Sequence, residues 1–232
     1  GSTISHPTTF TRAGLPAYAA AINTEYAAAF EWFDYDMAPL FTQSAYRWFA
    51  NSDSTDVGAS LAAQDSAATT TAAGASFRLR LLVHTSGQIS VSGQSFKLQF
   101  AGKGTGSCTS PSGGSPSAYT DVTAATVVAY RDNAAPSDGA ALTANANDPV
   151  HGADTVVNQT YEEANNFTNS QSAISAGQDG KWDFAFLDSS ASQNTTYCFR
   201  AVKSDGTALN TYSVYPEVTT FGSATVSIAS DQ

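Results

Sequence analysis

The sequence predicts an all-β fold in which two sheets pack face to face as a β-sandwich. Apolar and polar residues alternate over several short segments, as expected where one face of each strand is buried. Clusters of Gly, Pro, Asn, Asp and Ser separate these segments, which is typical of turns between strands. The segment 195–219 also has the pattern of a complete β-hairpin, with Ser204-Asp205-Gly206 as its turn.

Residues 1–40 differ from the rest because they combine many aromatic residues with runs of alanine. Pro16 is suited to open a helix over Ala17–Phe30, since alanine favours helices and proline suits the first helical position. Phe30–Met37 has instead the propensity of a strand. We expect a short helix or coil followed by a strand, forming an N-terminal arm ahead of a sandwich domain over residues 41–232.

The strands of the sandwich domain are predicted from alternation and propensity in chain order. They are Ala45–Ala50, Phe77–His84, Gln88–Val91, Phe96–Phe100, Val122–Tyr130, Trp182–Phe186, Tyr197–Val202, Tyr212–Val218 and Ala224–Ile228. Residues 102–117 and 133–159 are predicted as loops because they are rich in Gly, Ser, Pro, Asn and Asp. Pro216 lacks an N–H group, so the last part of the hairpin is expected at an open sheet edge.

The composition limits the classes of partner. The chain has 232 residues, of which 13% are charged, and a net charge of −10. Its few Lys and Arg residues are scattered, whereas nucleic-acid binding needs them clustered, so that class is excluded. No apolar run is long enough to span a membrane. The first ten residues lack the features of a signal peptide, and we expect that any export signal has been removed.

Cys108 and Cys198 are the two cysteines of the chain. An even number of cysteines in a polar chain predicts a disulfide, and hence an oxidising compartment, with two free buried thiols as the alternative. A zinc site is disfavoured because no histidine is adjacent to complete its ligands. If Tyr197 and Phe199 face the core, Cys198 faces outward, and the disulfide would hold the 102–117 loop against the outer face of a sheet.

The segment Trp182–Val218 resembles the last part of fibronectin type III and immunoglobulin-like sandwiches, with Tyr197 near the start of the penultimate strand. The blocks QSAYRWFANSDSTDVGASLAAQD, QTYEEANNFTN, GQDGKWDFAF and TYCFRAVKSDGTALNTYSVYPEVTT occur in this order. They resemble a repeat domain of large Ser/Thr/Ala-rich bacterial cell-surface proteins over residues 42–220. The resemblance implies export, display and an adhesive or envelope role, and it carries no catalytic residues.

The sequence does not indicate an enzyme. His6, His84 and His151 are far apart along the chain, and His84 and His151 are expected at the surface. No G-x-S-x-G or H-E-x-x-H motif occurs. The neighbours Glu162 and Glu163 face opposite sides of any strand, so a structural or solvated role is expected for them.

Three further kinds of site are considered. Calcium is the best cofactor candidate, at oxygen donors in loops: Asp53 with Asp56, Asn145 with Asn147 and Asp148, and Asp179 with Asp183. The glycosylation sequons begin at Asn158, Asn166 and Asn194. Trp32, Trp48 and Trp182 would suit a sugar-binding platform, but Trp48 and Trp182 lie in alternating strands and are expected in the core.

The arm is the main functional feature, because its aromatic side chains must pack against a protein surface. The residues expected to do so are Phe30, Trp32, Phe33, Tyr35 and Met37. They fold back on their own sandwich, add a strand to a neighbouring subunit, or dock on another envelope protein. Head-to-tail strand addition builds a filament. The sequence therefore predicts a non-enzymatic subunit of an extracellular filament, tube or surface layer; the alternative is a carbohydrate-binding or adhesive module.

Overall fold

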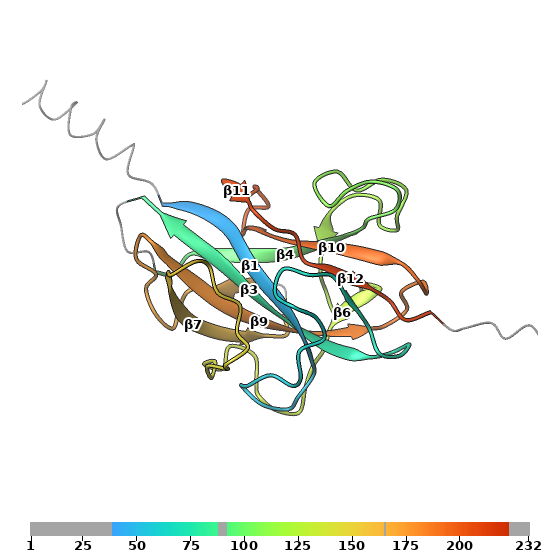
Figure 1. Ribbon diagram of the computed structural model, residues 1–232, viewed down its shortest axis with the longest axis horizontal. Helices are drawn as coiled ribbons and strands as arrows, with labels where there is room; N and C mark the ends of the chain where they lie inside the picture. The colour runs from blue at the N-terminus through green and yellow to red at the C-terminus, as the bar shows by residue number, and fades with distance from the viewer. Residues whose placement is uncertain (1–38, 88–91, 165, 223–232) are drawn as a thin grey trace, which may run out of the picture. The chain divides into compact units, whose positions relative to one another are not determined.

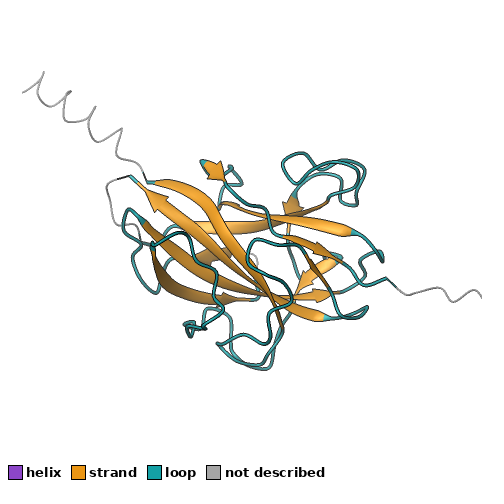
Figure 2. Cartoon of the chain, viewed as in Figure 1, coloured by secondary structure: helices purple, strands orange, loops and turns teal. Residues whose placement is uncertain are grey.

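The computed structural model describes residues 39–87, 92–164 and 166–222, and these residues form strands and loops without a helix (Figure 2). The strands are β1 Leu40–Ala50, β2 Ala68–Thr69, β3 Ser76–Ser86, β4 Ser95–Gly102, β5 Thr120–Asp121, β6 Val128–Tyr130, β7 Thr155–Glu162, β8 Asn166–Thr168, β9 Gln178–Asp188, β10 Thr196–Lys203, β11 Thr211–Tyr212 and β12 Glu217–Thr219. Within these ranges no helix is long and apolar enough to cross a membrane.

Two sheets pack against each other, which confirms the predicted all-β sandwich. Sheet A has the order β11-β1-β3-β9-β6, and β7 also pairs with β9 in parallel. Sheet B has the order β2-β12-β10-β4-β5, and β8 also pairs with β4. Figure 1 shows the strands β1, β3, β9 and β7 of sheet A side by side.

The space between the sheets is filled by aromatic and aliphatic side chains that alternate along the long strands. Trp48, Trp182, Phe184 and Phe199 are fully buried in this cluster, and the rings of Trp48 and Phe199 meet at 5.5 Å between centroids. The expected core positions of Trp48 and Trp182 are thus confirmed, and neither residue is available as a sugar-binding platform. Trp32 lies outside the described residues.

Gln43 is a buried polar residue that connects the two sheets. Its side-chain nitrogen donates to the carbonyl of Val214 at 2.7 Å, and its side-chain oxygen accepts from the amide of Ala201 in β10 at 2.7 Å. Both ends of the amide are therefore satisfied without water, as a buried polar group requires. The contact fixes the position of β1 relative to sheet B.

The long edges of sheet A are covered by other segments of the same chain. The segment 59–65 lies along β1, with Leu61 donating to the carbonyl of Trp48 and Asp65 to that of Tyr46. The segment 139–142 lies along β7 in the same way, and Leu142 donates to the carbonyl of Gln159. Covered edges reduce uncontrolled strand pairing between molecules.

The predicted hairpin at 195–219 is only partly correct. Its first strand is β10, but β11 leaves the hairpin and pairs with β1 in sheet A. Residues Glu217–Thr219 then return to β10 as β12. The free side of β12 pairs with β2, where Val218 is opposite Ala68. The open edge predicted beside Pro216 is therefore occupied by the chain itself.

Two other predicted elements differ from the structure. The strand expected over Val122–Tyr130 is divided, because β5 ends at Asp121 in sheet B and β6 begins at Val128 in sheet A. The loop expected over 133–159 includes the start of β7, whose sequence lacks alternation although it pairs with β9. The strand expectations for 88–91 and 224–228 and those for the arm lie outside the described residues.

Candidate functional site

The outer face of sheet A carries a buried polar layer. Arg78 and Arg80 of β3 point away from the core, as their alternation predicts, and so do Lys181 and Asp183 of β9. All four residues are nevertheless fully buried. The loops 51–66 and 131–154 cover them, and this covering is not evident from the local sequence.

Asp183 is the centre of this layer. Arg78 donates to both carboxylate oxygens of Asp183, from Nε at 2.8 Å and from Nη2 at 2.7 Å, and Arg80 Nε adds a third hydrogen bond at 2.8 Å. Arg78 also lies over the ring of Tyr161, with Cζ 4.6 Å from the centroid. Two-pronged contacts of this kind hold both partners in one orientation.

The loops are attached to the layer through charged and backbone groups. Arg78 Nη1 donates to the carbonyls of Ser52 and Ser54, and both Arg80 and Lys181 form ion pairs with Asp148. These charges also act on Arg80 itself. Burial opposes the charged form of Arg80, but the charges and hydrogen bonds of Asp183 and Asp148 outweigh it and raise the pKa. Arg80 thus remains a permanent cation beneath the loops.

A second cluster lies on the same face and combines two histidines with two aspartates. His84 Nδ1 is 3.2 Å from Asp154 Oδ2 and 3.6 Å from Asp179 Oδ2; His151 Nδ1 is 3.1 Å and 3.5 Å from the same two oxygens. The two imidazole rings meet at 5.0 Å between centroids. The two histidines are far apart along the chain but are neighbours on the outer face of sheet A, where both side chains remain partly exposed, at 17% and 39%.

Three elements position this cluster. His84 and Asp179 are paired directly across β3 and β9, so their side chains leave the same face of the sheet. His151 and Asp154 are brought together by a turn closed by a hydrogen bond from Asp154 N to His151 O, at 3.0 Å. Imidazole nitrogen and carboxylate oxygen are donors that divalent transition metals accept. The four residues are the group within the described ranges whose geometry is suited to hold such an ion.

Three of the carboxylates proposed for calcium, Asp56, Asp148 and Asp183, are engaged with other protein groups. Asp183 binds the two arginines, and Asp148 binds Arg80 and Lys181. Asn145 donates from its side chain to Asp56 Oδ1 at 2.8 Å, and Asp148 Oδ2 accepts from the amide of Asn145. The pairing predicted between Asp179 and Asp183 is replaced by separate contacts, since Asp179 faces the histidines.

The predicted disulfide between Cys108 and Cys198 is confirmed, with the Cα atoms 5.4 Å apart. Tyr197 and Phe199 belong to the core cluster, so Cys198 lies on the opposite face of β10. The disulfide holds the loop after β4 against that face. Tyr119 reinforces the contact by donating to the carbonyl of Cys108 at 2.6 Å.

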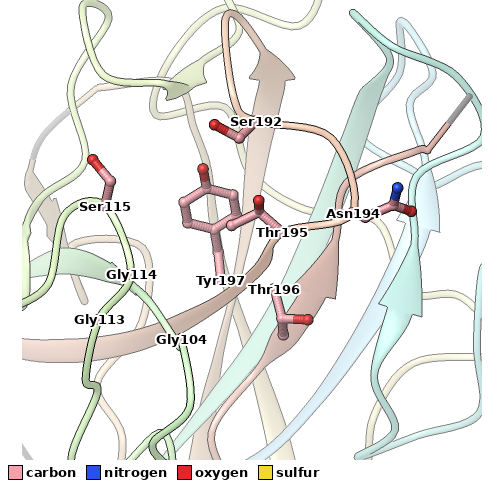
Figure 3. A pocket seen from close by; sticks show the side chains of 9 residues that line it. All are labelled: Gly104, Gly113, Gly114, Ser115, Ser192, Asn194, Thr195, Thr196 and Tyr197. Carbon is pink, nitrogen blue, oxygen red and sulfur yellow. The ribbon is translucent and has the colours of Figure 1, made fainter.

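A pocket of about 410 Å³ lies beside this loop (Figure 3). It is lined by Gly104, Gly113, Gly114, Ser115, Ser192, Asn194, Thr195, Thr196 and Tyr197. Figure 3 shows the ring of Tyr197 between the segment 113–115 and the segment 192–196, with its hydroxyl toward Ser192. The lining provides hydroxyl, amide and backbone groups, which bind polar ligands by hydrogen bonds.

The remaining predicted site residues are the asparagines of the glycosylation sequons and the aromatic residues of the arm. Asn166 and Asn194 are exposed, and Asn158 is half-buried in β7. The glycosylation of these three asparagines remains a prediction. Phe30, Trp32, Phe33, Tyr35 and Met37 of the predicted arm lie outside the described residues.

Glu162 provides a pH-dependent contribution to stability. Burial raises its pKa to about 8, against the opposing hydrogen bond from the Thr160 hydroxyl, and the nearby charge of Asp138 adds to the rise. Between pH 4.5 and pH 8 the folded chain therefore keeps a proton that the unfolded chain has lost. We expect the free energy of unfolding to fall as pH rises through this range, by up to a few kcal/mol, since one pKa unit corresponds to about 1.4 kcal/mol.

Urea denaturation at pH 5 and pH 8 measures this effect. Glu162→Gln cannot lose a proton, so the variant should lose less stability than the parent chain over the same interval and should be the more stable of the two at pH 8. Equal losses in the two proteins would show that Glu162 is not the group responsible.

Comparisons with protein-family models, with curated proteins and with solved structures give no match for this chain.

Proposed function

We propose that this chain is a non-enzymatic structural subunit of an extracellular or cell-surface assembly. The observation that carries the proposal is the self-contained construction of the sandwich. The chain covers the long edges of sheet A with its own segments, and a disulfide holds the 103–117 loop to β10. A unit of this kind resists unfolding and accidental strand pairing, as a subunit displayed outside the cell must.

The assembly step that we propose is contact by the N-terminal arm with a neighbouring subunit. The return strand cannot accept the arm, because β2 already pairs with β12. The arm would therefore dock by its aromatic side chains on another surface of the neighbour, or add to a shorter exposed edge. Such a head-to-tail contact continues from one subunit to the next.

Deletion of residues 1–38 tests this proposal, and it leaves β1 intact because that strand begins at Leu40. We expect the shortened chain to be a folded monomer, while the full chain forms concentration-dependent oligomers that are visible by size-exclusion chromatography and electron microscopy. The full-length variant Trp32→Ser with Phe33→Ser is the matched control and should lose assembly in the same way. A full chain that stays monomeric at high concentration contradicts the assembly proposal.

The pocket beside Tyr197 favours a second candidate function, binding of a carbohydrate. Its hydroxyl and amide groups are the donors and acceptors that a sugar requires. A glycan array probed with the same full chain separates the two candidates. Filaments without glycan binding support the structural subunit, and glycan binding by a monomer supports the adhesive module.

A further inference from the structure

We propose that His84, His151, Asp154 and Asp179 bind one divalent transition metal, with zinc preferred, and that the ion fastens the loop before β7 to sheet A. The inference does not depend on how the chain assembles. It rests on four observations: the spacing of the donor atoms, their lack of hydrogen-bond partners, the charge of the surrounding layer and the type of donor.

The spacing of the donor atoms matches that around a tetrahedral ion. Zinc holds imidazole nitrogen and carboxylate oxygen at about 2.0–2.2 Å, which places neighbouring ligand atoms roughly 3.4 Å apart in a tetrahedron. The four nitrogen-to-oxygen distances are 3.2, 3.6, 3.1 and 3.5 Å. All four donor atoms lie within 4.8 Å of one another, so a single ion can reach each of them.

The donor atoms lack the partners that buried polar groups normally have. Among the described residues, His84 Nδ1, His151 Nδ1 and Asp179 Oδ2 are buried and form no hydrogen bond. Asp179 is wholly buried, and its Oδ2 is directed toward both imidazoles. Buried polar atoms without partners are rare in proteins, and they often belong to sites that bind an ion. A metal at the centre would satisfy all three atoms at once.

The charges around the cluster favour a divalent cation, because the lysine and arginine residues of the polar layer neutralise other carboxylates. Three cations of the polar layer pair with three carboxylates: Arg78, Arg80 and Lys181 with Asp56, Asp148 and Asp183. Within the described residues, neither Asp154 nor Asp179 forms an ion pair with a lysine or arginine. Two carboxylates with two neutral imidazoles carry a charge of −2, which one divalent ion neutralises.

The donor types select the metal. Calcium and magnesium prefer oxygen ligands alone, whereas two imidazoles beside two carboxylates suit zinc and its neighbours in the first transition series. Four protein ligands fill a tetrahedral shell and leave no position for a substrate, which is typical of a structural site. Ser44 of β1 completes the arrangement as a positioning residue, since its hydroxyl donates to Asp179 Oδ1 at 2.6 Å and leaves Oδ2 free for the ion.

The ion would cross-link β3, β9 and the loop before β7, which no disulfide connects. His84 belongs to β3 and Asp179 to β9, whereas His151 and Asp154 belong to the loop that leads into β7. The same loop carries Asp148, which pairs with Arg80 and Lys181 under the cover. Metal binding would therefore stabilise the loop 131–154, which covers the polar layer, as well as the site itself.

Metal analysis of the full chain tests the proposal. The purified protein is stripped with a chelator, loaded with zinc and desalted, and its metal content and unfolding temperature are measured. We expect one zinc per chain and a higher unfolding temperature with zinc than without it. His151→Ala and Asp154→Asn should lose the bound zinc and the temperature shift, and Ser44→Ala should weaken binding about tenfold.

His6→Ala and Asp205→Asn are the matched controls, because they remove the same residue types and keep all four proposed ligands in the sequence. Both should keep one zinc per chain. Cobalt loading gives a second readout, since cobalt in a four-coordinate nitrogen and oxygen site absorbs strongly in the visible range, and His151→Ala should abolish this absorption. The proposal is overturned if the parent chain binds no zinc, if His151→Ala retains it, or if calcium displaces it.

Discussion

Replacement of Asp183 by asparagine should lower the free energy of unfolding by about 3–5 kcal/mol, which is the usual cost of breaking a buried ion pair. The carboxylate accepts two hydrogen bonds from Arg78 and one from Arg80, and all three side chains are fully buried. Asparagine keeps the shape of the side chain but leaves two guanidinium groups with less negative charge beside them. Urea or guanidinium denaturation with the linear extrapolation measures the difference.

Lys97→Ala is the control for this prediction. Lys97 pairs with Asp121 at 3.3 Å, and both side chains are partly exposed, at 28% and 36%. An exposed pair contributes at most about 1 kcal/mol, so this variant should be close to the parent chain in stability. Similar losses for Asp183→Asn and Lys97→Ala would mean that water reaches the layer and screens its charges.

Removal of the disulfide should have an effect of similar size. The bond closes a loop across a sequence separation of 90 residues, for which the chain-entropy model gives about 4–5 kcal/mol of stabilisation. The double variant Cys108→Ala with Cys198→Ala should therefore unfold at a clearly lower denaturant concentration. Limited proteolysis should cut the variant within 103–117, because the loop would lose its covalent attachment to β10.

The reduced parent chain provides the control. Reduction should reproduce the loss of stability, and it should leave the double variant unchanged because that variant has no disulfide to reduce. The opposite result, in which oxidised and reduced parent chains unfold at the same denaturant concentration, would show that Tyr119 and the backbone contacts hold the loop without the bond.

The parts of the fold that the sequence predicts well are those whose side chains alternate against the core. β3 and β9 are examples, because Phe77 to Val83 and Trp182 to Phe186 place apolar residues on one face. The start of β7 is missed, since its pairing with β9 depends on a parallel crossover and not on its own pattern. The return of the hairpin is wrong for a similar reason: Thr211 and Tyr212 pair with β1 in the other sheet.

The functional residues on the outer face of sheet A can also be predicted only in part from the sequence. Alternation correctly places Arg80 and His84 on the outer face of β3, but it does not indicate the loops that cover this face. The register of β3 against β9 sets His84 opposite Asp179, and only tertiary structure brings His151 beside them. The spacing of His151 and Asp154 within one turn, together with a strand histidine, is the available signal. It is weak because such pairs are common in loops.

Loops cover the outer faces of both sheets, and the two faces differ in the interactions that hold their loops in place. A covalent bond holds the loop over sheet B, whereas charges and the histidine–aspartate cluster hold the loops over sheet A. With the proposed zinc bound, a thiol reductant would act on the loop over sheet B and a chelator on the loop over sheet A, while the aromatic core lies buried between the two sheets. We therefore expect the redox state and the metal content of the surroundings to act on opposite faces of the molecule.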